Sequence, residues 1–411
     1  MNNTSKYKEY LCKAQHYLAC MIALCMPLSQ KIGPVLIAGL VFCWILNVDL
    51  KIYLTNLKTR KISLLFVSLY ILYAMGVLYS SNKDAAWFDM QSKLSLLIFP
   101  LLFSTSGIIS KEKIRQIFLF FYAGAFVAIV IELANALIIY INTSHVAFFY
   151  SELSIFMHPS YFAMYLTFAI ASMAYYLIDN PIQISPQMKF AFLFLMTFFT
   201  FFIVLLSSKA GILCAIITEG ICLAYFLFRK KKYQQVVLYA ISVILIYFIS
   251  LKYVVQHDFQ RLSQAKETLI ENKYANKATP ETNRVRIYIW EASIEIIKNN
   301  FLFGAGTGDV HMELNEQYKI RGMTGALNKN LNAHNQFIQT FIAIGVTGFC
   351  VLALSLALPF FQQIKRRKFL IPVFIFIVAF NFLFESILEL QAGVIFYAFF
   401  NSLLLFAEQE L

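Results

Sequence analysis

Long apolar stretches recur along almost the whole chain, separated by short polar segments. About 20 consecutive apolar residues are enough to cross a membrane as a helix. We predict twelve such spans, near residues 14–29, 33–50, 62–80, 92–108, 115–141, 160–179, 189–207, 210–228, 234–253, 334–358, 369–386 and 388–407. The pattern therefore predicts an all-α, polytopic integral membrane protein with about 12 transmembrane helices.

One long polar segment interrupts this pattern. It divides the chain into nine spans (1–253), a polar loop (254–333) and three further spans (334–411). The loop is predicted to be partly helical, over about 258–274 and again over 283–299. In the second helix an apolar stripe recurs at helical spacing, formed by Ile287, Trp290, Ile294 and Ile297. This stripe predicts a helix that lies along the membrane interface or packs over the bundle.

The composition also indicates a membrane protein, and the distribution of charge predicts its orientation in the membrane. Hydrophobic residues make up 60% of the 411 and charged residues only 14%, against about 45–50% and about 25% in soluble domains. With a cytoplasmic N-terminus, the inner segments carry 19 Lys and Arg and the short outer loops only four. This asymmetry follows the positive-inside rule, so the polar loop is predicted to face outward and both termini to be cytoplasmic. The net charge of +12 is then a signal of topology and does not indicate nucleic-acid binding.

The seven cysteines lie in or beside apolar spans and none lies in the polar loop. They indicate neither a disulfide framework nor a metal site.

A histidine stands where the polar loop enters the tenth span. If that helix begins near Asn332, then His334 lies in its first turn at the outer interface. The positive end of the helix disfavours imidazolium, so the ring would stay neutral and able to accept a proton. The alternative is a structural histidine at the interface, and these residues alone leave it open.

Two arginines begin the second helix of the loop. Arg284 and Arg286 lie in its first turn, where cations are disfavoured unless an anionic ligand holds them. Trp290, one turn after Arg286, is placed to stack on it. The alternative is an ordinary interfacial helix with snorkelling arginines. The glycine-rich run 303–308 lacks the strand–turn–helix context of a dinucleotide site and indicates a turn, with a phosphate cradle as a weaker alternative.

Several motifs together resemble the O-antigen ligase and polymerase family. They are Arg286-x-x-x-Trp290, then Gly304-x-Gly306, then His334-Asn335 followed after nine residues by Gly345-x-x-Gly348. The resemblance covers about residues 200–350, and the remainder agrees in topology.

The resemblance implies a GT-C-like membrane glycosyltransferase of the bacterial inner membrane, with no metal and no cofactor. Such an enzyme moves a glycan from undecaprenyl pyrophosphate to an acceptor hydroxyl, for example on lipid A core, at the outer face. By position, His334 would be the base and Arg286 would clamp the phosphates, helped by Arg284 and Lys209.

Four other residues are predicted from their positions to support the site, namely Asn335, Trp290, His158 and Glu385. Glu385 and Glu389 flank the last outer turn and are placed to orient His334 or Arg286. The family's usual Ser-Arg pair is Ser208-Lys209 here, which keeps the charge but loses the bidentate fork.

Three interpretations remain open. The first is a ligase onto lipid A core or the related protein O-oligosaccharyltransferase, and the second is a polymerase of glycan repeat units. The third is a transporter or flippase for the lipid-linked glycan, which would be expected to show paired half-repeats and broken helices. The sequence shows neither, and the outer loop with its arginine and histidine favours an enzyme.

Overall fold

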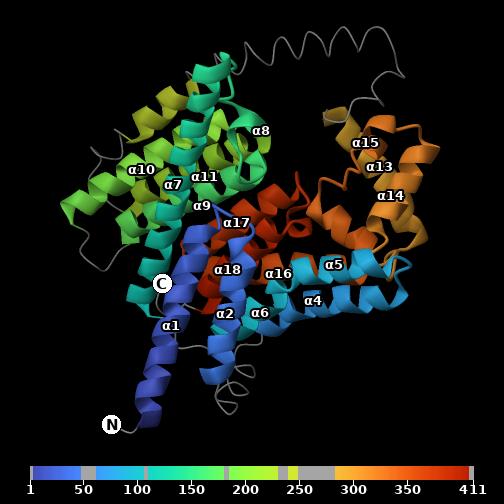
Figure 1. Cartoon of the computed structure of the whole chain (residues 1–411), viewed down its shortest axis with the longest axis horizontal. Coiled ribbons are helices and arrows are strands. Elements are labelled where there is room, and N and C mark those ends of the chain that lie inside the picture. The colour runs from blue at the N-terminus through green and yellow to red at the C-terminus, as the bar shows by residue number, and fades with distance from the viewer. Residues whose placement is uncertain are drawn as a thin grey trace.

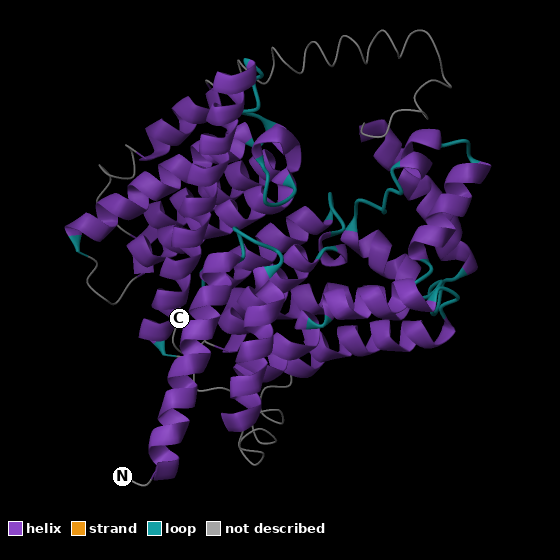
Figure 2. Cartoon of the chain, in the orientation of Figure 1, coloured by secondary structure: helices purple, strands orange, loops and turns teal. Residues whose placement is uncertain are grey.

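The computed structural model describes residues 3–47, 62–105, 110–179, 185–229, 239–248 and 283–406. These residues form helices joined by loops (Figure 2), without strands. The expected helical segment at 258–274 lies outside them, as does the part of the polar loop before residue 283.

The helices follow the chain in this order: α1 (Asn3–Cys25), α2 (Ile32–Asn47), α4 (Ile62–Tyr79), α5 (Lys83–Lys93), α6 (Ser95–Thr105), α7 (Lys111–Thr143), α8 (Tyr150–Leu153), α9 (Pro159–Asp179), α10 (Pro186–Leu205), α11 (Lys209–Arg229), α13 (Asn283–Asn299), α14 (Val310–Ile320), α15 (Thr324–Asn328), α16 (Gln336–Lys365), α17 (Leu370–Phe382) and α18 (Gln391–Phe406). A short 3-10 turn, η2 (Ile387–Glu389), precedes α18.

Six of the described helices are long and apolar enough to cross a membrane: α4, α7, α9, α10, α11 and α16. Further apolar helices have 10–17 residues: α2, Tyr239–Phe248, α17 and α18. The prediction of a polytopic all-α chain is confirmed for the described residues, whereas the number of twelve spans stays a prediction.

Polar side chains fix where several helices begin. Asn82, Ser110 and Ser185 precede α5, α7 and α10, and each accepts a hydrogen bond from the backbone N–H three residues on. Such caps satisfy N–H groups that have no partner within the helix and typically stabilise it by about 1 kcal/mol.

Helix α9 forms the centre of the bundle. In its most apolar window 94% of the residues are buried, and it lies among α7, α10, α11 and α17 (Figure 1). Phe168 of α9 packs against Phe118 of α7, Phe374 of α17 and Phe400 of α18. Each such aromatic pair contributes about 0.5–1.5 kcal/mol beyond the area it buries. This packing fixes the ends of α9, α11 and α17, where the site described below is found.

Helices α13, α14 and α15 stand together at one side of the molecule, beside α4 and α5 (Figure 1). The predicted apolar stripe of α13 is wrong for Ile287 and Ile294, which are 52% and 49% exposed, whereas Trp290 and Ile297 are partly buried against the core. The fully buried apolar residues of α13 are instead Val285, Ile289, Ala292 and Ile296. Two rows of apolar residues share the helical spacing, and the packing against α14 and α16 selects the row that the sequence did not favour.

Helix α16 is broken at Ile344 and Gly345, where the backbone leaves the helical region. The sequence analysis did not predict this break. The break frees two carbonyl groups, of Ile342 and Ala343, which accept hydrogen bonds from the N–H groups of Ala305 and Gly306. The break thus holds the glycine-rich turn against α16.

The same turn is fixed at its other side by the loop between α4 and α5. The N–H of Gly308 donates to Ser80, and the Asp309 carboxylate accepts hydrogen bonds from the N–H groups of Ser81 and Asn82. These backbone donors are already used within the protein. The turn therefore has a structural role, and the alternative prediction that its N–H groups bind a phosphate is not supported.

Gly345 is expected to be required for this turn. Its φ is +67°, and a Cβ there would lie 2.3 Å from the carbonyl oxygen of Leu302. The close neighbour of Gly345 is therefore the backbone of the loop between α13 and α14. Gly345→Ala should cost roughly 1–3 kcal/mol of stability, measured as a lower midpoint of thermal aggregation in detergent. The matched control is Gly220→Ala on α11, where a Cβ meets nothing within 4 Å; an equal loss in both variants would contradict the expectation.

Candidate active site

His334 lies just before α16 and not in its first turn. The helix begins at Gln336, with Asn335 as its N-cap, and the side chain of Asn335 accepts from the N–H of Ile338. The predicted start near Asn332 is wrong because the Asn332 side chain accepts instead from the N–H of His334, which closes a local turn. His334 itself has φ +46°, a left-handed conformation that a residue with a Cβ rarely adopts and that is enriched at functional sites.

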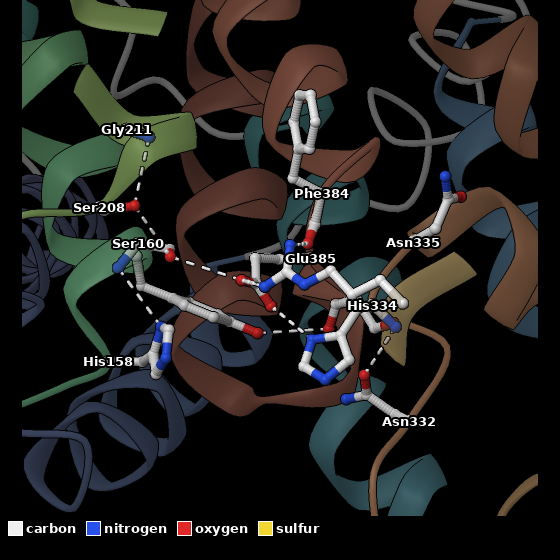
Figure 3. A network of polar contacts seen from close by, with 12 residues as sticks. His158, Ser160, Ser208, Gly211, Asn332, His334, Asn335, Phe384 and Glu385 are labelled. Atoms are coloured by element: carbon white, nitrogen blue, oxygen red, sulfur yellow. Dashed lines mark hydrogen bonds and ion pairs between the residues drawn. The ribbon is translucent and has the colours of Figure 1, made fainter. Parts of the chain in front are cut away.

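A carboxylate joins the histidine to the arginine of α13. Nδ1 of His334 lies 3.2 Å from Oε2 of Glu385. Nη2 of Arg286 donates to Oε1 of Glu385 at 2.9 Å, and its Nη1 donates to the carbonyl of Phe384 at 2.8 Å. Figure 3 shows the His334 ring and the Glu385 carboxylate facing each other. Three segments distant in sequence therefore meet at one carboxylate.

The surroundings of Glu385 keep it ionised. Burial would raise its pKa, but the hydrogen bond with His334 and the positive charge of Arg286 outweigh this and hold the pKa below the ordinary value of a glutamate. This interaction stabilises the fold at pH values above the ordinary glutamate pKa, and it is lost as the pH falls through the lowered one. At neutral pH Glu385 is therefore a carboxylate that accepts hydrogen bonds.

This carboxylate gives the two ring nitrogens of His334 different roles. A proton on Nδ1 donates to Glu385, which leaves the lone pair of Nε2 available as a base. Among the described residues Nε2 makes no hydrogen bond, and the side chain is 21% exposed. A histidine oriented by a carboxylate is the arrangement that serves general-base catalysis in hydrolases.

Trp290 supports the histidine from α13. Its indole N–H donates to the carbonyl of Ala333 at 2.9 Å, directly beside His334. Arg286 and Trp290 do lie one turn apart, but the expected stacking is replaced by separate contacts, because Glu385 holds the guanidinium. The Arg-x-x-x-Trp spacing thus lets one helix face position both Glu385 and the backbone of His334.

The family model described as O-antigen ligase matches residues 191–353. This segment contains α13, the Gly-rich turn and the start of α16, with the motifs that indicated the family. The predicted resemblance to the O-antigen ligase and polymerase family is therefore confirmed over this segment. A search of curated proteins found no match to the chain.

Glu385 lies outside the matched O-antigen ligase segment and is held by residues within it. Asn335 donates through Nδ2 to the carbonyl of Leu383 at 3.1 Å. The buried Gln336 accepts through Oε1 from the N–H of Leu388 at 2.6 Å. Asn335 therefore has two functions, since it caps α16 and also fixes the loop that carries Glu385.

The N-terminal ends of α9 and α11 approach Glu385 from the other side (Figure 3). Ser160 Oγ lies 3.5 Å from Oε1 of Glu385 and 3.1 Å from Oγ of Ser208, which in turn accepts from the N–H of Gly211. A Cβ on Gly211 would lie 2.5 Å from Cβ of Ala163, so the glycine permits the close contact between α9 and α11. Sequence reasoning missed Ser160, for which the His158-Pro-Ser run before an apolar helix was the available signal.

Three further predicted residues lie around this centre. Lys209 is exposed and begins α11, directly after Ser208. His158 is exposed and accepts through Nδ1 from the N–H of Ser160 at 3.3 Å. Arg284 is exposed on the first turn of α13, two residues before Arg286. The matched segment therefore contributes Lys209, Arg284 and Arg286 as cations on the elements around Glu385.

Glu389 does not orient His334 or Arg286, as its place in the sequence had suggested. Its Oε1 pairs with Nζ of Lys93 at 3.2 Å, and Lys93 also pairs with Asp89 at 3.2 Å. Lys93 is fully buried, with its ammonium group 5.0 Å from the centroid of the Tyr73 ring. This cluster anchors the end of the loop that begins at Glu385. The sequence analysis did not predict this cluster, because Lys93 was only one of the four cations assigned to the short outer loops.

Within the described ranges no three His, Cys, Asp or Glu side chains are grouped so that they could hold a metal ion. The charged groups at the site are thus the carboxylate of Glu385 and the surrounding cations and histidines.

Proposed function

We propose that this chain transfers a glycan from undecaprenyl pyrophosphate to an acceptor hydroxyl, as an O-antigen ligase acting on lipid A core. The observation that carries the proposal is the contact of Glu385 with both His334 and Arg286, next to the ends of α9 and α11. The O-antigen ligase domain supports the same class of reaction.

In the proposed reaction His334 is the general base. Its Nε2 takes the proton of the acceptor hydroxyl while the oxygen attacks the anomeric carbon of the donor sugar. The bond between that carbon and the pyrophosphate oxygen breaks, and undecaprenyl pyrophosphate leaves with the electron pair. Glu385 stabilises the imidazolium that forms, because its carboxylate lies beside Nδ1.

Arg286 has the proposed role of neutralising the leaving pyrophosphate. Its contacts to Glu385 and Phe384 use two of the five N–H groups of the guanidinium, so the others remain to donate to phosphate oxygens. Lys209 and Arg284 would add charge from α11 and α13. Cations placed at a developing negative charge replace what a metal ion would supply, so the proposed reaction takes neither a metal nor a cofactor.

The proposal includes the finer architecture expected from the sequence. It comprises twelve spans in a GT-C-like arrangement, 1–253 and 334–411 in the bacterial inner membrane, and 254–333 on the outer face. Both termini would be cytoplasmic. What supports this orientation is the excess of Lys and Arg in the inner segments.

A gel of surface glycans from a deletion strain of the source bacterium tests the proposal. We expect glycan to disappear from lipid A core while lipid-linked glycan accumulates, with recovery on complementation. A ladder reduced to one repeat unit would indicate the polymerase instead, and loss of glycan from proteins alone would indicate the protein O-oligosaccharyltransferase. Unchanged surface glycans would contradict all three transferase assignments, and loss of outward-facing lipid-linked glycan would indicate a flippase.

A further inference from the structure

A cavity lies far from His334, between α11, α16 and α17. Its volume is about 560 Å³, within the range of about 300–1,000 Å³ of small-molecule sites. Its walls are mostly apolar and include Ile221, Phe360, Val373 and Phe376. Helix α11 has 21 residues between Lys209 and Arg229, so its two ends are about 30 Å apart at 1.5 Å per residue. The cavity is near the Arg229 end and is therefore separate from the site around Glu385.

Three cations line one edge of this cavity. Arg229 is the last residue of α11, and Arg367 and Lys368 lie in the short connection between α16 and α17. The acidic group at this edge is Asp179, at the end of α9. It lies 3.8 Å from Nε of Arg229 and accepts a hydrogen bond from the hydroxyl of Tyr225. Among the described residues this edge therefore carries three cations, of which Arg229 is paired with Asp179.

The charged and apolar groups that line the cavity are arranged along the helices like the headgroup and acyl chains of a phospholipid. Ile221 and Tyr225 precede Arg229 by two turns and one turn, and Val373 and Phe376 follow Lys368 by a similar distance. Tyr225 stacks on Phe369 with ring centroids 4.0 Å apart, at the boundary between the two kinds of lining. The cations thus lie at the ends of the helices and the apolar walls lie one to two turns deeper. Basic pockets between membrane helices are typical binding sites of anionic lipid headgroups.

We propose that this cavity binds an anionic phospholipid, with its phosphate at Arg367, Lys368 and Arg229 and an acyl chain along the apolar walls. The cations would donate hydrogen bonds to the phosphate, and the acyl chain would fill an apolar space between three helices. The proposal does not depend on the transferase reaction, because the cavity is at the far end of α11.

Lipid retention by the purified full chain tests this proposal. The protein is exchanged into detergent with equal amounts of phosphatidylglycerol and phosphatidylcholine, and the retained lipids are counted by native mass spectrometry. We expect phosphatidylglycerol to be retained in preference. The double variant Arg367→Gln, Lys368→Gln should weaken its retention by roughly 10-fold or more, since each cation contributes about five-fold.

The matched control is the double variant Lys365→Gln, Arg366→Gln, which removes two charges from residues next to the cavity that do not line it. We expect this control to retain phosphatidylglycerol like the wild type, and Val373→Trp, which fills the cavity, to lose it. Equal retention of the two phospholipids by the wild type would overturn the proposal, and so would equal losses in the two double variants. Preferential retention of added undecaprenyl phosphate would also overturn it, because the occupant would then be the carrier lipid.

Discussion

His334→Ala is expected to abolish glycan transfer while the protein stays inserted and folded. A positioned general base contributes about 10²–10⁴-fold to the rate, and Nε2 of His334 is the proposed base because Glu385 occupies Nδ1. The fold should be retained, because Asn332 accepts from the N–H of His334, Trp290 donates to the carbonyl of Ala333, and Glu385 keeps its ion pair with Arg286. The measurement is the amount of glycan on lipid A core in the deletion strain that carries the variant, at matched protein levels in the membrane.

The chain supplies a matched control for this variant. His145 also contacts a glutamate, with Nε2 2.9 Å from Oε2 of Glu152, but both side chains are more than half exposed and lie outside the site. His145→Ala removes the same ring and the same kind of ion pair, and we expect it to complement the deletion fully. Equal activity of the two variants would remove His334 from the reaction.

Arg286→Ala should have the second largest effect. The substitution removes the proposed phosphate contact, and hydrogen bonds to charged groups contribute about 1.5–3 kcal/mol each. It also leaves Glu385, only 10% exposed, without its guanidinium partner. We therefore expect the KM for the lipid-linked donor to rise at least about 10-fold, with a lower kcat. Arg286→Lys should be intermediate, since it keeps the charge and loses the planar fork.

Arg115 on α7 provides the control for the arginine. Its Nη2 lies 2.8 Å from Oε1 of Glu112 and its side chain is 25% exposed, against 2.9 Å and 31% for Arg286. Arg115→Ala therefore breaks a comparable ion pair away from the site, and we expect no change in the KM for the donor. A donor KM that is the same in wild type, Arg286→Ala and Arg286→Lys would show that Arg286 does not bind the donor.

Sequence patterning was sufficient for the features that depend on local spacing. Apolar stretches placed the long helices, including α7, α9 and α16, because twenty apolar residues have few alternatives to a membrane helix. The Arg286-x-x-x-Trp290 spacing correctly predicted one helix carrying both residues, starting at Asn283. The family motifs were also recognisable from the sequence, because each is a short run of neighbouring residues, and all of them lie within the matched segment.

Features that depend on contacts between distant residues could not be predicted in this way. Glu385 is 51 residues from His334 and 99 from Arg286, and it was one of two glutamates near the same turn. Nothing local distinguishes it from Glu389, which pairs instead with the buried Lys93. The packed face of α13 was also ambiguous, because two apolar rows share its periodicity and tertiary packing decides between them.

The most direct test of the proposed reaction is the transfer rate of the purified full chain on an undecaprenyl-pyrophosphate-linked glycan and its acceptor. Wild type, His145→Ala and His334→Ala are compared at the same concentration, with and without added imidazole. We expect wild type and His145→Ala to transfer glycan equally, and His334→Ala to be slower by at least about 100-fold. Imidazole should restore part of the rate in His334→Ala alone. Transfer by His334→Ala at the wild-type rate would contradict the assignment of His334 as the base.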